Sequence, residues 1–316
     1  MFEPSTVVMT QPIHASAQAR IPAAGHRLRA LDSPHPLTAT QLGQSLDEAA
    51  GLVCHLTDLV DENVLAAPRL RVVATVSAGT DHIDMAAAAR HGVHVVNTPD
   101  VLTEATADHA MALLLAVARR IPEADALVRA GRYRGWRLMD ELMGLDVSGT
   151  TLGIVGMGRI GEAVARRART AFGMQILYSG SSVRRHVDLD LDARHVQLDE
   201  LLARSDFVSL HTPLTRQTRH LLDARALAAM RPHACLINTA RGALVDEAAL
   251  AEALLAGRLA GAGLDVFEDE PVVHERLLEC RRQVVLTPHL GSATHRTRER
   301  MSHLAVDGLL ERLAAG

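Results

Sequence analysis

The feature that most constrains this chain is the glycine-rich segment Thr151–Gly161, which reads T-L-G-I-V-G-M-G-R-I-G. An apolar, β-branched run leads into it, and the helical pattern Glu162–Phe172 follows. In a strand–turn–helix of this kind the glycines of G-x-G-x-x-G have separate uses. Gly156 would make the tight turn, Gly158 would let the backbone approach a diphosphate, and Gly161 would allow close packing of the helix. Ordinary glycine-rich turns share the motif, but the strand and helix flanking it favour dinucleotide binding.

The next apolar run, Gln175–Tyr178, bears on which dinucleotide is bound. About 20 residues beyond the fingerprint, a dinucleotide fold usually places an acidic residue on the ribose 2′-hydroxyl. Here the chain reads S-G-S-S-V-R-R and has no acidic residue. Serine hydroxyls and guanidinium groups suit a 2′-phosphate. We therefore expect a preference for NADP(H), while a solvated basic loop beside an NAD(H) site is the alternative. The cofactor contacts predicted in this loop are Ser179, Ser181 and Arg184, assisted by Arg185.

Composition excludes several classes of function. The chain has 316 residues, of which 48% are hydrophobic and 22% charged, and its net charge is −4, as expected for a soluble globular protein of two domains. Aromatic residues make up only 2% and no basic patch interleaves with them, so nucleic-acid binding is not expected. The sequence contains no lysine, which excludes Schiff-base chemistry and a Walker-type phosphate loop.

The cysteines and the apolar runs indicate a cellular setting. Cys54, Cys235 and Cys280 form no C-x-x-C pair and suit buried roles in a reducing compartment, so we expect neither disulfides nor a metal site. The N-terminus lacks a charged-then-apolar signal, and no apolar run reaches about 18 residues. We therefore expect a cytoplasmic protein with no membrane partner.

Apolar runs alternate with helical patterns along most of the chain, which is typical of parallel α/β architecture. The predicted strands are Ser5–Thr10, Gly51–Leu56, Leu70–Val76, Val93–Val96, Thr151–Val155, Gln175–Ser179, Phe207–Leu210, Ala234–Asn238, Gly263–Val266 and Gln283–Leu286. The predicted helices are Asp61–Ala67, Met85–His91, Ala107–Arg119, Glu162–Phe172, Leu198–Ala203, Glu247–Ala256 and Thr294–Ala315. The stretch from 11 to 36 has no clear pattern.

The fingerprint lies in mid-chain, so we expect a nucleotide domain inserted between two pieces of another domain. The predicted fold is two Rossmann-like, doubly wound parallel-sheet domains with an interdomain cleft. Residues 99–288 would form the dinucleotide-binding domain, and 1–98 with 289–316 the substrate-binding domain. The helix Ala107–Arg119 is so rich in Ala, Leu and Met that we expect it to be covered by a second subunit, in a homodimer.

Three ionisable residues follow predicted strands beyond the fingerprint, at the ends where ligands bind in open α/β sheets. They are Arg241 in N-T-A-R-G, Glu270 in D-V-F-E-D-E-P and His289 in T-P-H-L-G. Each alone is more often a surface or loop residue. Together they suit the reduction of a 2-oxo acid. The arginine would bind the substrate carboxylate and keto oxygen, the histidine would supply a proton, and the glutamate would hold the imidazole in its charged form.

These motifs resemble the D-isomer-specific 2-hydroxyacid dehydrogenases, and the similarity runs from about residue 50 to the C-terminus. The resemblance implies that Arg241, Glu270 and His289 are catalytic; Glu270 is chosen over Glu268 because the family glutamate directly precedes proline. It also implies a substrate-binding turn at V-S-A-G-T-D, where the amides of Ala78 and Gly79 would form an anion nest. Ser292 joins Arg241 and His289 as a substrate contact. Implied cofactor contacts are Thr106, Gly156, Gly158, Arg159, Ile160, Gly161, Thr212, Pro213, Thr239, Ala240, Arg241, Asp265, His289 and Gly291.

Within the family, V-L-T-E-A-T at 101–106 and G-S-A-T-H-R-T at 291–297 look most like glyoxylate/hydroxypyruvate reductases, which use NAD(P)H. A glutamine in place of Glu270 would have indicated a formate dehydrogenase. Two alternatives stay open. The first is a dehydrogenase for another D-2-hydroxy acid, and the second is a dinucleotide-sensing corepressor, which is a binding module on the same fold. Steady-state turnover of glyoxylate distinguishes the corepressor from an enzyme.

Overall fold

The computed structural model describes residues 4–31, 33, 37–139, 141–280 and 284–315. The chain forms two compact units, one of residues Met1–Leu102 with Ala293–Gly316 and the other of residues Thr103–Ser292. We call them unit 1 and unit 2. The division lies within about four residues of each predicted domain boundary. No helix in the described part of the chain is long and apolar enough to cross a membrane, and the cytoplasmic location stays a prediction.

Unit 2 contains a seven-stranded, wholly parallel sheet in the order β12-β11-β10-β9-β6-β7-β8. Counted within the unit, this is the Rossmann order with one further strand, and its order reverses between β6 and β9. The strands are β6 (Thr151–Val155), β7 (Gln175–Ser179), β8 (Arg194–His195), β9 (Phe207–Leu210), β10 (Cys235–Asn238), β11 (Gly261–Leu264) and β12 (Val284–Leu286). Gln283, the first residue of the last predicted strand, lies outside the described residues.

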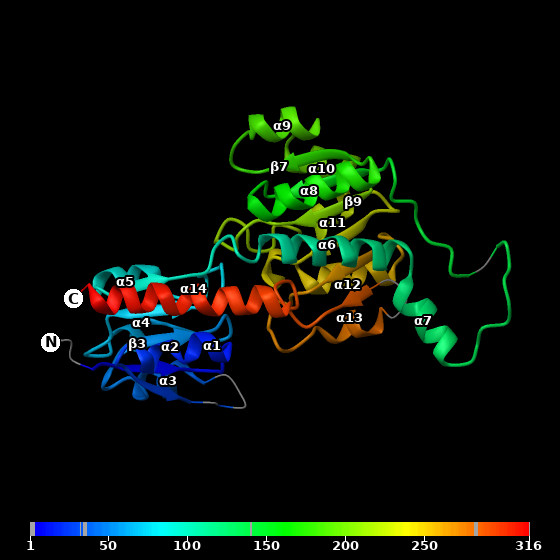
Figure 1. Cartoon of the computed structure of the whole chain (residues 1–316). Helices are drawn as coiled ribbons and strands as arrows, with labels where there is room; N and C mark the ends of the chain where they lie inside the picture. The colour runs from blue at the N-terminus through cyan, green and yellow to red at the C-terminus, as the bar shows by residue number, and fades with distance from the viewer. Residues whose placement is uncertain (1–3, 32, 34–36, 140, 281–283, 316) are drawn as a thin grey trace. The chain divides into compact units, whose positions relative to one another are not determined.

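Helices cover both faces of this sheet (Figure 1). Alternate residues of one strand point to opposite faces. Ile154 of β6 therefore packs with α6 (Thr103–Ala118), α8 (Arg159–Phe172) and α9 (Arg185–Leu191). Its neighbour Val155 packs on the other side with α10 (Leu198–Arg204), α11 (Ala224–Ala229), α12 (Glu247–Leu255) and α13 (Glu275–Glu279). The remaining helices of the unit are α7 (Ile121–Arg129) and the short 3-10 helix Gly242–Leu244.

Unit 1 contains a smaller parallel sheet in the order β2-β1-β3-β4-β5, which is the flavodoxin-like order with its reversal between β1 and β3. Its strands are β1 (Thr6–Met9), β2 (Arg27–Ala30), β3 (Ala49–Cys54), β4 (Val72–Thr75) and β5 (His94–Val96). Both predicted parallel α/β domains are therefore confirmed, and the unplaced stretch 11–36 contains an edge strand.

The helices of unit 1 also lie on both faces of its sheet. One face packs against α3 (Ala39–Gln44), α4 (Glu62–Leu65) and α5 (Met85–Arg90). The other is covered by α14 (His295–Ala314), which runs along β3, β4 and β5, with α1 (Ala15–Gln18) and α2 (Arg20–Ala23) beside it. Gly51 of β3 faces this helix, and a Cβ there would lie 3.3 Å from a terminal methyl of Leu309, which would have to shift slightly.

The apolar surface of α6 is buried within unit 2, which overturns the reason given for a subunit interface on this helix. Ala107, Ala110, Leu113, Leu114 and Ala118 are all nearly inaccessible. They pack against α8 and the sheet strands β10 and β11, so the helix needs no second subunit to cover it. The homodimer itself is a separate question and stays a prediction.

Candidate active site

The three glycines of the fingerprint have different surroundings, and these match the needs of a bound diphosphate. Gly156 has a φ of +97°, and a Cβ there would lie 2.7 Å from the backbone of His211. At Gly161 a Cβ would lie 2.3 Å from the carbonyl oxygen of Gly156, so helix and turn can meet only through glycine. At Gly158 nothing lies within 4 Å of the added atom. The space over the N-terminus of α8 is therefore open, and no side chain caps the helix there.

A buried hydroxyl supports the same assignment. Thr239 follows β10 and is 8% exposed, yet its Oγ1 has no hydrogen-bond partner among the described residues. Because a buried polar group without a partner is costly, this atom fits a group that arrives with a ligand. Thr212 and Pro213 follow β9, and Thr106 lies in the first turn of α6. These residues lie at the carboxyl ends of strands and at the start of a helix, which is where a dinucleotide binds in this type of fold.

The loop after β7 is anchored by one buried tyrosine. The hydroxyl of Tyr178 accepts a hydrogen bond from the amide of Arg184 at 2.8 Å and donates one to Asp188 Oδ1 at 2.8 Å. Tyr178 is fully buried, and burial raises the pKa of its hydroxyl, so it stays a donor. In the loop that follows Tyr178, the side chains of Ser181, Arg184 and Arg185 are exposed. Neither arginine makes an ion pair with another described residue.

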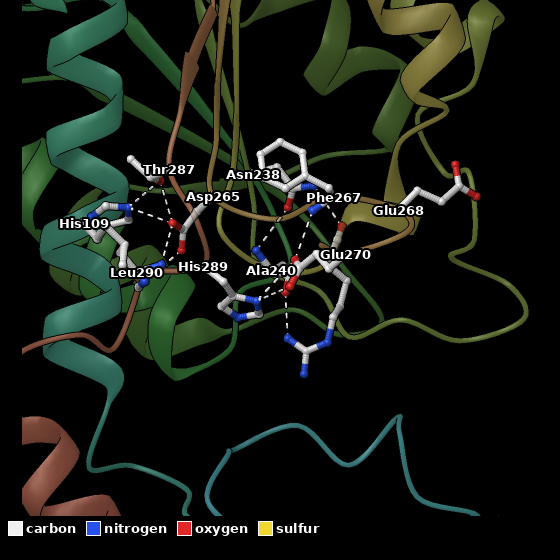
Figure 2. A network of polar contacts seen from close by, with 12 residues as sticks. His109, Asn238, Ala240, Asp265, Phe267, Glu268, Glu270, Thr287, His289 and Leu290 are labelled. Carbon is white, nitrogen blue, oxygen red and sulfur yellow. Dashed lines mark hydrogen bonds and ion pairs between the residues drawn. The ribbon is translucent and has the colours of Figure 1, made fainter. Parts of the chain in front are cut away.

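His289 and Glu270 lie in direct contact, as the sequence predicted. His289 Nδ1 is 2.9 Å from Glu270 Oε2 and 3.2 Å from Oε1, and each side chain is about one quarter exposed (Figure 2). Glu270 Oε1 also accepts a hydrogen bond from the amide of Phe267 at 3.1 Å, which fixes the carboxylate. With Nδ1 held in this way, the Nε2 of the imidazole is the atom left for a substrate.

Arg241 is held by the backbone of its own loop and by a buried asparagine. Asn238 is 1% exposed; its Nδ2 donates to the carbonyl oxygen of Arg241 at 2.8 Å, and its Oδ1 accepts from the amide of Ala240 at 3.1 Å. The next residue, Gly242, lies so close to the backbone of Phe267 and Glu268 that any Cβ would overlap it. The loops that carry Arg241 and Glu270 are therefore packed directly on each other.

Asp265 organises the segment that carries His289. It is fully buried and accepts hydrogen bonds from the amides of Leu290 (2.7 Å) and Gly291 (2.8 Å) and from the hydroxyl of Thr287 (2.6 Å). His109 Nε2 lies 3.1 Å away (Figure 2). Burial alone would raise the pKa of Asp265, but the hydrogen bonds from His109, Thr287 and Leu290 outweigh it and lower that pKa. The carboxylate thus holds the backbone that follows His289, and the amide of His289 donates to the backbone carbonyl of Asp265 at 2.9 Å, with its φ at 53°.

Several of these supporting residues were not predicted from the sequence. His109 is the single histidine of the otherwise largely apolar helix α6. A lone histidine in such a helix was the signal that could have pointed to it. Tyr178 lies one residue before the end of its strand and had no motif of its own, and Asn238 opens the N-T-A-R-G motif but was given no role. Ser292 is half-buried next to Gly291, while Arg159 and Ile160 begin α8.

Ala78 and Gly79 lie in unit 1, in the loop after β4. The Asn97 side chain donates to the carbonyl oxygen of Ala78 at 2.8 Å, and the Ser77 hydroxyl donates to that of Gly79 at 2.7 Å. Both carbonyl groups are thereby hydrogen-bonded to side chains, one from the same loop and one from the residue that follows β5. The amides of Ala78 and Gly79 have no hydrogen-bond acceptor among the described residues, as an anion nest requires.

Comparison with known proteins agrees with this geometry. The NAD binding domain of the D-isomer specific 2-hydroxyacid dehydrogenases matches residues 111–291. The chain belongs to this family. A glyoxylate reductase of Thermococcus litoralis is 48% identical over 272 residues, which cover 84% of this chain and 81% of the relative.

Solved structures extend the likeness to nearly the whole chain. A protein of Thermus thermophilus superimposes with a TM-score of 0.91 at 45% identity, covering 98% of this chain and 97% of its own. An NADPH-dependent glyoxylate/hydroxypyruvate reductase of Sinorhizobium meliloti, solved with NADP and malonate, gives a TM-score of 0.86 at 36% identity, covering 97% of this chain and 93% of its own. The protein is thus a nicotinamide-dinucleotide-dependent oxidoreductase acting on 2-oxo and 2-hydroxy acids, and the corepressor alternative is not favoured.

Proposed function

We propose that this protein reduces glyoxylate and hydroxypyruvate to the D-2-hydroxy acids, with NADPH as its preferred cofactor. The observation that carries the proposal is the His289–Glu270 pair, whose 2.9 Å contact leaves one imidazole nitrogen for a substrate. The named activities of the relatives support the choice of small 2-oxo acids. Unit 1 is proposed as the substrate-binding domain and unit 2 as the dinucleotide-binding domain.

The proposed mechanism assigns one task to each of the three side chains. A nicotinamide dinucleotide, which the turn from Gly156 to Gly161 and the hydroxyl of Thr239 would hold, would supply the hydride for C2 of the oxo acid. Protonated His289 donates from Nε2 to the carbonyl oxygen as negative charge develops there, and Glu270 stabilises the imidazolium through Nδ1. The guanidinium of Arg241 binds the substrate carboxylate and the developing oxyanion. The amides of Ala78 and Gly79 bind carboxylate oxygens.

The experiment that tests the activity is a steady-state panel of glyoxylate, hydroxypyruvate, pyruvate and 2-oxoglutarate, each with NADPH and with NADH. We expect the highest kcat/KM for glyoxylate or hydroxypyruvate with NADPH. A clear preference for pyruvate or 2-oxoglutarate would overturn the proposed substrate and leave the reaction type intact. Absence of turnover with every oxo acid, despite tight NADPH binding, would overturn the enzyme assignment.

The preference for NADP(H) rests on the exposed loop that Tyr178 anchors. We propose that Arg184 binds the 2′-phosphate, with Ser179, Ser181 and Arg185 beside it. A charge-assisted hydrogen bond to phosphate is worth about 1.5–3 kcal/mol, so Arg184→Ala should weaken NADPH binding about tenfold or more. NADH binding should barely change, and Arg258→Ala, an exposed arginine before β11, should change neither. Equal losses for both cofactors would mean that Arg184 supports the loop and does not bind the phosphate.

We propose that the protein is a homodimer, and that the contact involves α7 and the segment after it. The exposed large apolar side chains of this region are Ile121, Val128, Tyr133, Trp136, Leu138, Met139 and Met143. Trp136 alone is 79% exposed. So many exposed large apolar side chains in one stretch of chain are typical of a subunit contact. Sedimentation velocity should give a dimer for the wild type and a shift to monomer for Trp136→Arg with Leu138→Arg. A monomeric wild type at micromolar concentration would contradict the proposal.

A further inference from the structure

Two histidines and a glutamate that are remote in sequence converge on one surface of unit 1. They are His14, which precedes α1, and Glu299 and His303 of α14. The candidate ligand atoms of the three side chains all lie within 4.8 Å of one another. Glu299 and His303 are four residues apart on one helix, so they project from the same face. None of these residues has a part in the proposed reaction.

The two imidazole rings already point toward a common position. His14 Nδ1 lies 2.7 Å from the hydroxyl oxygen of Ser16, and His303 Nε2 lies 2.8 Å from the same oxygen. Their ring centroids are 6.4 Å apart. A hydroxyl has a single hydrogen, so at most one ring nitrogen can accept from this oxygen and at least one must donate to it. A cation at that position would meet a lone pair of each neutral ring.

The backbone around the cluster is fixed by packing and hydrogen bonds. The amide of His14 donates to the hydroxyl of Ser302 at 3.1 Å, which holds the start of α1 on α14. Ala17 and Ile21 are fully buried in this contact region, and Arg20 forms an ion pair with Asp307 one turn further along α14. The backbone that carries the donors is therefore held by packing, and the three side chains would have to rotate toward a bound ion to reach Zn–N distances near 2.0–2.1 Å.

From this geometry we propose that His14, Glu299 and His303 form a binding site for a divalent transition-metal ion of the zinc type. Two imidazoles and one carboxylate are the ligand set that zinc and its neighbours accept, whereas calcium and magnesium require mostly oxygen ligands. Three protein ligands leave a fourth position to water. The bound ion joins residue 14 to residue 303 and so clamps the two chain segments from which unit 1 is assembled. The sequence offered no sign of it, because His14 lies 285 positions before Glu299 and a single glutamate–histidine pair on a helix does not by itself indicate a metal site.

The test is calorimetric titration of the full-length protein, freed of metal by EDTA and dialysed, with zinc chloride. We expect one zinc per chain with a dissociation constant on the order of 10 µM, weaker than a four-ligand structural site. His303→Ala and Glu299→Gln should each weaken this binding at least about tenfold. Zinc should also raise the Tm of the wild type but not that of His303→Ala.

Two control variants separate the proposed site from zinc bound elsewhere. His91→Ala removes another histidine–carboxylate pair of unit 1, the one with Glu62, and should leave the zinc titration unchanged. Ser16→Ala removes the hydroxyl that occupies the position of the ion, so it should bind zinc at least as tightly as the wild type. A full zinc equivalent that persists in His303→Ala, or one that disappears in Ser16→Ala, would overturn the proposed ligand set. Heat from magnesium chloride comparable to that from zinc would overturn the assignment of the ion.

Discussion

The loop after β4 in unit 1 and the loops after β10, β11 and β12 in unit 2 offer ligands two different kinds of group. In unit 1 the amides of Ala78 and Gly79 are the available donors, and the side chains of Ser77 and Asn97 serve only to shape the loop. In unit 2 the groups are ionisable: a guanidinium, an imidazole and two carboxylates. Backbone amides can bind an anion at any pH, but they cannot give up a proton. We infer that unit 1 contributes binding alone, while unit 2 contributes both binding and chemistry.

The largest effect should come from the proton donor of unit 2. His289→Ala should lower kcat for glyoxylate about 10²–10⁴-fold, because general acid catalysis is lost. NADPH binding, measured by fluorescence titration, should stay within about threefold of the wild type because only the chemical step needs the proton. A near-normal kcat for His289→Ala would contradict the inference that unit 2 supplies the proton donor.

A backbone substitution tests unit 1. Ala78→Pro removes one amide donor, and a hydrogen bond to a charged carboxylate is worth about 1.5–3 kcal/mol, so KM for glyoxylate should rise about 10- to 100-fold. Ala78→Ser keeps the amide and should leave KM nearly unchanged. Circular dichroism and Tm would check that the proline variant folds. Equal increases in KM for both variants would indicate that the side chain at position 78 matters, and would contradict substrate binding by the backbone amides of unit 1.

Unit 2 also holds a histidine whose ionisation acts on folding. Burial lowers the pKa of His211 from 6.5 to about 4, and its Nε2 is hydrogen-bonded to the Ser209 hydroxyl. As the pH falls below 6.5, His211 becomes protonated in the unfolded chain, whereas in the folded chain it stays neutral until about pH 4. The free energy of unfolding should therefore fall over this range. The full shift converts to about 3 kcal/mol, but His211 is only partly buried, so we expect about 2 kcal/mol.

Urea unfolding at pH 7 and pH 4.5 measures this loss, which His211→Asn should reduce. The exposed His186→Gln serves as the control and should leave it unchanged. If wild type and His211→Asn lose the same stability between the two pH values, His211 is not responsible for the loss.

The smallest effect concerns the charge beside His289. Glu270→Gln keeps the shape of the side chain and removes the carboxylate that favours the imidazolium, so the alkaline limb of kcat/KM for reduction should move to lower pH. At pH 8 the variant should be about tenfold less active, which corresponds to a shift of about one pH unit. The matched control is Glu268→Gln, whose carboxylate pairs instead with Arg219 and His220. Superimposed profiles for wild type and Glu270→Gln would refute the coupling.

The sequence predicts the strands of unit 2 better than those of unit 1, because a strand can be recognised only where its residues form an apolar run. The strands of unit 2 are short apolar runs with clear turns, and the site residues follow them in recognisable motifs. The edge strand Arg27–Ala30 of unit 1 reads R-L-R-A and is mostly exposed, so it has no apolar run to reveal it. In unit 2, the predicted strand Gly263–Val266 lies two residues beyond the observed Gly261–Leu264, because glycine and alanine give a weak strand signal.

A contact between two side chains could be predicted where both partners lie in recognisable motifs, and could not where a partner comes from a distant segment without one; the catalytic roles stay a prediction. His289 and Glu270 were paired correctly from their motifs. That His109 reaches Asp265 across 156 positions of sequence could not be read from either local pattern. The same limit applies to the cluster of His14 with His303. Long-range contacts of this kind follow from the strand order and the packing of each sheet, which only the folded chain shows.

The single anchoring hydroxyl of Tyr178 has a consequence for how this enzyme could change its coenzyme. The segment from Gly180 to Arg185 is exposed throughout and joins the interior of unit 2 only at its two ends. Substitutions within it disturb no buried contact, so they carry little thermodynamic penalty. Under the proposed binding of the 2′-phosphate by this loop, natural drift or laboratory selection could change coenzyme preference by substituting these six residues while the rest of the enzyme stays as it is.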